Sequence, residues 1–401
     1  MSGLLAVAEA EALIGQNLRP FASEVLPLDR APGRILRQRV LAERDQPPFD
    51  RVMMDGIAIA QGDAAALPRY RVAGVQLAGM ATAQLGDHGD CLEVTTGAIM
   101  PAGCDTVIPV EQIRRAGEYF ELLEGYRPLA GQFVHARGSD CRRADELLAP
   151  GVRLGAPELA VLAANGVAQV EVATVPSIAL ISTGDELVDV DAPVADWQIR
   201  RSNDLALAAA LRARGFDDQV FAHVRDDLAA TTECLGQLLA QRQVLILTGG
   251  VSMGQRDYVP AALHALGVRA VFHKIAQRPG KPMWFGIGRE GQAVFALPGN
   301  PVSALACGLR YVLPGLLAAQ GANAETAVRV VLNAGVDTSP SLTCFVPVQV
   351  YHDETGRALA QPVPSKTSGD FSSLTRTHGF VQLPPGPGRF EAGYVAAFYR
   401  W

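Results

Sequence analysis

The alternation of short apolar runs with helical segments between residues 175 and 319 constrains the fold more than any other feature of this sequence. Runs such as SIALIST, QVFAHV and VLILTGG have the length and the β-branched content of buried strands. The helices expected between them cover residues 204–214, 228–241 and 258–266, and a closing helix covers residues 301–318. This order predicts a parallel, doubly wound sheet.

Three of the predicted strands run into loops that are rich in glycine, small hydroxyl side chains and acids. Ligands of doubly wound sheets bind at the carboxyl ends of the strands. Glycines let backbone N–H groups approach an anion closely, and a following helix adds a favourable potential. Turn formation explains most single loops of this kind, but three in one sheet predict an anion site. The loops are Ser182-Thr183-Gly184-Asp185-Glu186, Thr248-Gly249-Gly250-Val251-Ser252-Met253-Gly254 and Leu297-Pro298-Gly299-Asn300-Pro301.

Charged side chains near the predicted loops suit a phosphorylated, metal-assisted substrate. Arg278-Pro279-Gly280-Lys281 places two cations around a rigid turn, with Lys274 upstream, although a solvated basic loop is the commoner fate of such a cluster. Mg²⁺ binds a few carboxylates together with substrate phosphates and water. Any single acid is more often a solvated surface residue, and Asp226 and Asp227 could equally begin a helix. The acids are Asp55, Asp140, Asp185, Glu186, Asp226, Asp227 and Asp257.

The rest of the chain differs in pattern from the alternating segment. Residues 4–16 have helical periodicity, and the prolines of DQPPFD at 45–50 exclude a helix there. Short β-type runs rich in glycine predict a mostly β domain over residues 54–134. A second helix is expected at 157–165, and the runs from residue 328 onward predict a small all-β domain at the end of the chain.

Composition bounds the class of protein. A chain of 401 residues predicts two to four domains, and 49% hydrophobic with 19% charged residues indicates a soluble globular protein. A net charge of -6 argues against a general nucleic-acid binder. The six cysteines are scattered, which predicts free thiols in a reducing compartment. The first residues do not resemble a signal peptide, and no apolar run approaches the ~20 residues of a membrane helix, so we expect a cytoplasmic protein.

The segment Gly250-Val251-Ser252-Met253-Gly254 also matches the nucleophile elbow of α/β-hydrolases. That fold needs an acid and a histidine from distant loops later in the chain. His264 and His273 follow too closely, and no oxyanion motif precedes the serine. The motif without its context is weak support for a hydrolase.

In combination and order, these segments resemble the molybdopterin molybdenumtransferase family, of the MoeA and gephyrin E-domain type. The resemblance runs from about residue 5 to the C-terminus, and seven spaced motifs in one order are far more specific than any one of them. The motifs are Asp45-x-Pro47-x-Phe49-Asp50 with Met54-Asp55-Gly56, Thr96-Gly97-Ala98 through Glu111, Gly138-x-Asp140, Ser182 to Leu187, Thr248 to Asp257, Pro279-Gly280-Lys281-Pro282, and Leu297-Pro298-Gly299-Asn300-Pro301.

The resemblance implies a multidomain α/β plus β architecture with four parts. Residues 1–44 with 141–174 would form an elongated, discontinuous domain, and residues 45–140 would form an inserted, mostly β domain. Residues 175–320 would form the molybdopterin-binding, doubly wound α/β domain, and residues 325–401 a β-barrel-like domain. The resemblance also implies a homodimer, with the site between the α/β domain of one chain and the inserted domain of the other.

The resemblance also implies the reaction and the residues that carry it. Molybdate would be inserted into adenylylated molybdopterin with Mg²⁺ and release of AMP; an adenylyltransferase and a molybdoenzyme are possible partners. The implied catalytic residues are Asp55, Thr96, Asp140, Glu186, Asp226 and Asp257, and Glu186, Asp226 and Asp257 would bind the metal. The implied molybdopterin and nucleotide ligands are Ser182, Thr183, Gly184, Asp185, Thr248, Gly249, Gly250, Ser252, Gly254, Lys274, Arg278, Pro279, Gly280, Lys281, Pro298, Gly299, Asn300 and Ser368.

Four positions depart from the family's pattern. His135 and Pro347 stand where arginines are usual, Arg278 replaces a lysine, and Gln255 fills a position that is usually acidic. The loss of two arginines weakens anion binding, and Arg differs from Lys in donor geometry. A molybdopterin-binding scaffold and a paralogue with another metal or pterin specificity therefore remain open. An adenylyltransferase also remains open, although it needs neither the N-terminal motif nor the terminal β domain.

Overall fold

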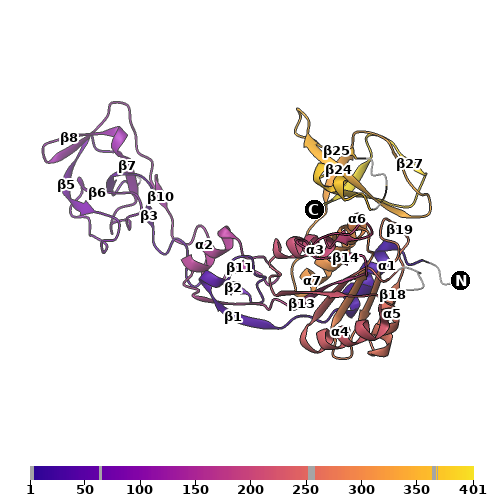
Figure 1. The fold of residues 1–401 in the computed structure, drawn as a ribbon. Coiled ribbons are helices and arrows are strands. Elements are labelled where there is room, and N and C mark those ends of the chain that lie inside the picture. Colours follow the sequence, from indigo (N-terminus) through magenta and orange to yellow (C-terminus); the bar gives the residue numbers. More distant parts are fainter. Residues whose placement is uncertain (1–3, 63–65, 252–257, 364–366, 368) are drawn as a thin grey trace. The chain divides into compact units, whose positions relative to one another are not determined.

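The computed structural model describes residues 4–62, 66–251, 258–363, 367 and 369–401. Its contacts group into two compact units, shown with their elements in Figure 1. The sheet unit comprises Met1–Gln38, Pro150–Gly155 and Gln169–Trp401, and the inserted unit comprises Arg39–Ala149 and Ala156–Ala168. The finer four-part division expected from the sequence stays a prediction.

A six-stranded sheet in the order β16-β13-β17-β21-β20-β18 organises the sheet unit. The first four strands are parallel, as predicted, and β18 runs in the same direction. β20 lies between β21 and β18 and is antiparallel to both, so the expectation of a wholly parallel sheet is wrong at this edge. A short turn joins β20 to β21, and only a parallel pair needs a long crossover. The strands are β13 (Ile178–Thr183), β16 (Gln219–Val224), β17 (Val244–Thr248), β18 (Arg269–His273), β20 (Trp284–Ile287) and β21 (Ala293–Leu297).

Helices cover both faces of this sheet (Figure 1), as expected for a doubly wound fold. Successive residues of a strand point to opposite faces. Ile178 and Leu180 therefore belong to one apolar cluster, and Ala179 and Ile181 belong to the other. The first cluster includes residues of α1 (Val7–Asn17), α3 (Asn203–Arg212), α6 (Pro301–Cys307) and α7 (Leu313–Ala319), and the second includes residues of α4 (Leu228–Gln241) and α5 (Val259–Ala265).

The helix α6 continues through a π-helical segment, Gly308–Val312, into α7. By length and composition alone the stretch Pro301–Ala319 could cross a membrane, which corrects the expectation that no apolar run comes near that length. However, 72% of this stretch is buried within the protein. Arg310 at its centre is also buried and donates to Glu11 and Gln382, so these contacts are those of a core helix.

The C-terminal strands close into a five-stranded barrel, because β24 pairs with both β25 and β26. This confirms the predicted β-barrel-like domain. Phe380 is fully buried and stacks on Tyr399, and both join the apolar cluster of the α/β sheet. The strands are β22 (Val328–Leu332), β24 (Thr343–His352), β25 (Ala358–Pro362), β26 (Gly379–Leu383) and β28 (Val395–Arg400), with β19 (Gln277–Arg278) added to β24 and β23 (Val336–Asp337) paired with β27 (Arg389–Phe390).

The inserted unit is mostly β, as predicted. Its main sheet has the order β7-β4-β6-β5-β9-β8, and the pairs β3–β10 and β2–β11 lie outside it. The strands are β2 (Val40–Leu41), β3 (Arg51–Val52), β4 (Gly56–Ile59), β5 (Arg69–Gln76), β6 (Asp90–Val94), β7 (Thr106–Pro109), β8 (Ile113–Ala116), β9 (Tyr119–Leu122), β10 (Val134–His135) and β11 (Glu146–Leu148); the helix is α2 (Ala156–Ala164). In the sheet unit, β1 (Ser23–Pro27) pairs with β12 (Gln169–Ala173), and β14 (Leu187–Val188) pairs with β15 (Ile199–Arg200).

Candidate active site

Three loops meet at the carboxyl edge of the α/β sheet because β13, β17 and β21 are parallel neighbours. The Thr183 hydroxyl donates to the carbonyl of Thr248 at 3.4 Å, and the Gly249 N–H donates to the carbonyl of Leu297 at 3.1 Å. A Cβ atom added to Gly299 would lie 3.6 Å from the Gly249 Cα. The sequence-predicted loops are therefore in direct contact with one another.

Glycine is required where the first two of these loops touch. Gly249 has φ 93°, and an added Cβ would lie 2.7 Å from the Thr183 carbonyl oxygen. Gly250 has φ 65°, and its added Cβ would lie 2.8 Å from Val259. Both positions combine a left-handed backbone with a close approach that only glycine tolerates. The Gly249-Gly250 turn is thus fixed in shape by its packing against β13.

The predicted ligands at this edge differ in accessibility. Ser182 and Thr248 are buried in their strands, with 1% and 3% of their surface exposed. Gly299 and Asn300 are exposed, as are the acids Asp185 and Glu186. Thr183, Gly184 and Pro298 are buried, Gly249 and Gly250 are half-buried, and Ser252, Gly254 and Ser368 lie outside the described residues.

Two neighbouring segments border the Gly299-Asn300 loop. The Asn203 side chain, at the start of α3, donates to the Gly299 carbonyl at 2.6 Å. A Cβ added to Gly369, in a loop of the barrel, would lie 3.9 Å from Asn300 Oδ1. Asn203 had no functional signal in the sequence beyond its place at a helix start. The barrel and α3 thus both contribute to the border of this edge.

The cationic loop rests on a buried polar network. Arg278 and Lys281 are exposed, Pro279 and Lys274 are half-buried, and Gly280 is buried. Beneath them, Gln277 Nε2 donates to the Gly280 carbonyl at 3.1 Å. Two further residues bond to the same Gln277 side chain. The Tyr311 hydroxyl donates to Gln277 Oε1, and Cys307 Sγ accepts from Gln277 Nε2 at 3.4 Å.

This network keeps the cation loop in one conformation. Gly280 has φ 94°, and a Cβ there would lie 2.6 Å from both Cys307 Sγ and Gln277 Nε2. Burial raises the pKa of the Cys307 thiol to about 12, so the sulfur stays protonated. A satisfied buried network of this kind specifies a single local structure. Gln277, Cys307 and Tyr311 carried no signal in the sequence, because a buried polar residue has no motif of its own.

Acids from two adjacent strand ends also meet at the sheet edge. The Asp226 N–H donates to Asp185 Oδ1 at 3.3 Å, and Arg225 lies 3.6 Å from the same carboxylate. A Cβ added to Gly184 would lie 2.6 Å from Glu186 Oε2, so the Glu186 carboxylate folds back on its own loop. Asp227 caps α4 by accepting from the Ala230 N–H at 2.8 Å, which confirms the helix-start alternative for this residue.

The donor set at this edge fits Mg²⁺ in chemistry. Glu186 is exposed and Asp226 is half-buried, and Mg²⁺ commonly takes one or two carboxylates plus substrate phosphates. The third acid of the predicted set, Asp257, lies outside the described residues. Within the ranges that the structure describes, no group of three or more His, Cys, Asp or Glu residues is arranged to hold a metal alone.

In the inserted unit, Asp55 and Thr96 form one group. Asp55 Oδ1 accepts from the Thr96 N–H at 2.7 Å and from its hydroxyl at 2.9 Å. The backbone bond first, and the hydroxyl bond second, lower the pKa of Asp55, so the exposed carboxylate stays charged. The next residue, Gly56, has no room for a side chain, because a Cβ there would lie 1.9 Å from the Ile108 carbonyl oxygen. The Met-Asp-Gly motif and the Thr-Gly motif are thus in direct contact.

The second group of the inserted unit contains Asp140. Asp140 Oδ1 lies 2.8 Å from His135 Nε2, and His135 Nδ1 lies 2.9 Å from the Arg51 guanidinium. Asp45 and Asp50 of the Asp-x-Pro-x-Phe-Asp motif accept from backbone N–H groups of the loop that carries Asp140. Those two acids are therefore scaffold residues.

Pro347, the other position where the family usually has an arginine, is buried in β24 opposite Phe380.

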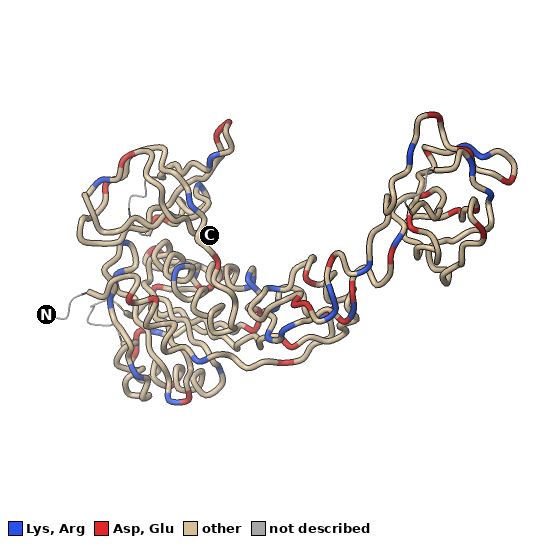
Figure 2. Tube along the Cα trace, turned by 180° about the vertical axis from the view of Figure 1, so that it is seen from behind, with Lys and Arg blue, Asp and Glu red and all other residues tan. Residues whose placement is uncertain are grey.

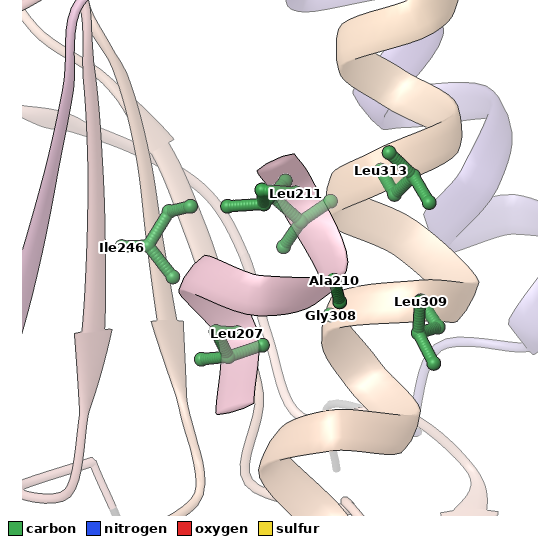
Figure 3. A pocket seen from close by; sticks show the side chains of 8 residues that line it. Leu207, Ala210, Leu211, Ile246, Gly308, Leu309 and Leu313 are labelled. Carbon is green, nitrogen blue, oxygen red and sulfur yellow. The ribbon is translucent and has the colours of Figure 1, made fainter. Parts of the chain in front are cut away.

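Two hollows of the molecule differ in kind: one is a small gap in the core, and the other is open to the surface. Figure 3 shows side chains that line an apolar cavity between α3, the π-helical segment and β17. Its volume of about 10 Å³ is too small for a substrate. An open hollow of about 180 Å³ in the inserted unit is lined by Asp55 and Glu93 together with apolar residues such as Val110. Figure 2 shows acidic and basic residues interspersed along both units.

Comparison with known families covers nearly the whole chain. Residues 5–166 match the model of the MoeA N-terminal region (domain I and II), residues 179–318 match a probable molybdopterin-binding domain, and residues 329–401 match the MoeA C-terminal region (domain IV). A molybdopterin molybdenumtransferase from Synechocystis sp. is 36% identical over 99% of this chain and 100% of its own length.

This chain belongs to the MoeA family of molybdopterin molybdenumtransferases. A second curated member, from Synechococcus elongatus, is 34% identical over 93% of each chain. The crystal structure of a molybdopterin biosynthesis MoeA protein from Pyrococcus horikoshii OT3 superposes with a TM-score of 0.84 at 26% identity and covers 100% of both chains. The chain is therefore a transferase of molybdenum cofactor biosynthesis, as the sequence motifs predicted.

The close approach at Gly249 is testable by stability. Gly249→Ala should lower the free energy of unfolding by about 2–5 kcal/mol, since a left-handed Ala costs roughly 1–2 kcal/mol and forced displacement of Thr183 roughly 1–3 kcal/mol. Gly33→Ala is the matched control, because Gly33 has φ 78° and nothing within 4 Å of an added Cβ. Urea unfolding midpoints measure both. Equal losses in the two variants would contradict the contact.

The Asp55–Thr96 contact is testable by titration. Thr96→Val removes the hydroxyl donor but keeps the backbone N–H, so the pKa of Asp55 should rise partway toward its usual value. Because the pKa of Asp55 is lower in the folded than in the unfolded protein, the carboxylate stabilises the fold at pH values above its unfolded-state pKa. This stabilisation is lost as the pH falls through the folded-state pKa. Thr95→Val is the control, because the Thr95 hydroxyl accepts from the Ala78 N–H. Carboxyl NMR titration measures the shift, and an unchanged Asp55 pKa would exclude the hydroxyl as a cause.

Proposed function

We propose that this enzyme inserts molybdate into adenylylated molybdopterin in a Mg²⁺-dependent reaction that releases AMP. One observation carries the proposal: the three loops after β13, β17 and β21 meet at one sheet edge, where exposed acids accompany them. Such an edge is where doubly wound sheets bind nucleotides and phosphates. Family membership supplies the pterin, because residues 179–318 match a probable molybdopterin-binding domain.

The sheet unit would bind the pterin and the nucleotide. The Gly250 N–H and backbone N–H groups of the Gly299-Asn300 loop would face phosphate oxygens, with α6 beginning directly after Asn300. The Gly249 N–H is already bonded to the Leu297 carbonyl and would hold the turn in place. The exposed cations Arg278 and Lys281 would neutralise phosphate or molybdate charge. Their loop is already held by Gln277, so little ordering would be needed on binding.

Glu186 and Asp226 would hold Mg²⁺ together with the substrate's phosphates. The ion would supply charge neutralisation when bound. Asp227 does not join this set, because its carboxylate caps α4. Asp185 accepts from the Asp226 N–H and thereby keeps the two acidic loops together.

The reaction has two parts, the hydrolysis of the pyrophosphate and the insertion of molybdenum into the dithiolene. Water adds to a phosphorus of the pyrophosphate, the bridging P–O bond breaks, and AMP leaves while the pterin keeps its phosphate. The two dithiolene thiols displace two molybdate oxygens, which leave with the thiol protons as hydroxide. The carboxylates of Asp55 and Asp140 would orient water or accept protons from it. The low pKa of Asp55 keeps that group charged as an acceptor of hydrogen bonds.

We propose further that Asp55, Thr96 and Asp140 act in trans, from the inserted unit of a second copy in a homodimer. A two-fold dimer would then carry two equivalent shared sites. The protein would work in the cytoplasm, taking its substrate from an adenylyltransferase and passing the product toward a molybdoenzyme.

Mixing two inactive variants tests this arrangement. With adenylylated molybdopterin, Mg²⁺ and molybdate, the wild type should release AMP, and Asp55→Asn and Glu186→Gln should each release almost none. After an equimolar mixture is allowed to exchange subunits, one of the two sites in each mixed dimer is intact, so about one quarter of the wild-type rate should return. AMP release is measured by chromatography.

The controls separate the possible failures. Wild type that binds the pterin tightly but releases no AMP would contradict the transferase proposal and leave a scaffold. Active wild type without recovery in the exchanged mixture would show that each site is built within one chain. A mixture of Asp55→Asn with Asp140→Asn, both in the inserted unit, should not recover.

A further inference from the structure

His135 lies between a cation and a carboxylate in the inserted unit. It forms a cross-strand pair with Arg51, because β10 and β3 run antiparallel with these two residues in register. Its Nδ1 lies 2.9 Å from Arg51, and its Nε2 lies 2.8 Å from Asp140. We propose that His135 is a positioning residue that orients the Asp140 carboxylate, and that Arg51 fixes the imidazole tautomer required for this.

The tautomer follows from the inventory of donors. A guanidinium carries only N–H donors and keeps its proton, so the Nδ1 atom facing Arg51 has to be the acceptor. The proton of a neutral imidazole then sits on Nε2, which donates to Asp140 Oδ1. A proton on Nδ1 would instead point a second donor at the guanidinium. Arg51 thus selects the one form of His135 that can donate to Asp140 without losing its other bond.

The surroundings leave the orientation of Asp140 to His135. Asp140 is exposed, with 55% of its side chain accessible, whereas 25% of the His135 side chain is accessible. Among the described residues, His135 is the ion-pairing partner of the Asp140 carboxylate. Arg137, two residues from His135, is engaged with Asp45 at 2.9 Å and does not compete.

The backbone of the same loop is held separately. Asp50 accepts from the Arg137 N–H, and the Asp140 N–H donates to the Gln46 carbonyl at 2.9 Å. Removing the imidazole should therefore free the carboxylate without unfolding the loop. Partners that orient metal-binding side chains commonly contribute about 10–100-fold to affinity or activity, and we expect a similar contribution from a partner that orients the Asp140 carboxylate.

This inference rests on the proposed function, in which Asp140 takes part in AMP release. In the holo assay, His135→Leu should lower kcat for AMP release by about 10–100-fold with little change in KM for the pterin. His135→Gln should recover most of the rate, because its Oε1 can accept from Arg51 while its Nε2 donates to Asp140. His88→Leu is the control, because His88 is an exposed histidine of the same unit.

A spectroscopic measurement is independent of turnover. Imidazole ¹⁵N–¹H spectra of the full-length protein should show His135 protonated at Nε2 near neutral pH. Arg51→Leu should remove the selection and give a mixture of the two tautomers. His135 protonated at Nδ1 in the wild type would overturn the proposal even with turnover intact.

The kinetic outcomes are equally distinct. A His135→Leu enzyme with wild-type kcat, or a His135→Gln enzyme no better than His135→Leu, would also overturn it. A wild type that releases no AMP would contradict the proposed function itself, and the assignment of Asp140 on which His135 acts would fall with it.

Discussion

The contact of the Gly249-Gly250 turn with Thr183 is the constraint on which the candidate site depends. It brings two loops within van der Waals distance, and Gly299 packs on the same turn from the third strand. The order β13-β17-β21 makes this convergence possible, because parallel neighbours end at the same edge. A side chain at Gly249 would push this edge apart at the point where a phosphate is expected to bind. The apolar interior of the sheet determines where the loops emerge, and glycine determines how closely they approach.

The two units offer different chemistry. The edge of the sheet unit combines glycine turns, the cations Arg278 and Lys281, and the acids Glu186 and Asp226, which suits a phosphorylated ligand with a divalent metal. The inserted unit presents two carboxylates, each held by a named partner: Asp55 by Thr96 and Asp140 by His135. Preorganised charges of this kind act most strongly where reaction charge develops.

Sequence reasoning predicted the features that follow from local pattern. Strand and helix order, the three loops at strand ends and the mostly β character of the inserted unit all follow from periodicity and turn residues. The reversed direction of β20 was not predictable, because a short buried strand has the same apolar composition in either direction. The role of Asp227 did not follow from the sequence, because an aspartate suits both a helix N-cap and a metal ligand. In the structure it caps α4.

Contacts between residues far apart in the chain were beyond the sequence. Gln277 and Tyr311 meet beneath the cation loop although 34 positions separate them. His135 looked only like a lost arginine, whereas the structure shows it between Arg51 and Asp140. Asp45 and Asp50 belong to a recognisable motif, and their work in holding the Asp140 loop became visible only with the backbone bonds.

The central claim is that the sheet unit binds the pterin and the carboxylates of the inserted unit act on it. Equilibrium titration of Asp55→Asn with adenylylated molybdopterin tests this most directly. We expect the Kd to stay within about threefold of the wild-type value, a difference below ~1 kcal/mol, since the carboxylate contributes to chemistry and not to holding the pterin. A loss of affinity of about a hundredfold or more, close to 3 kcal/mol, would contradict this division of roles.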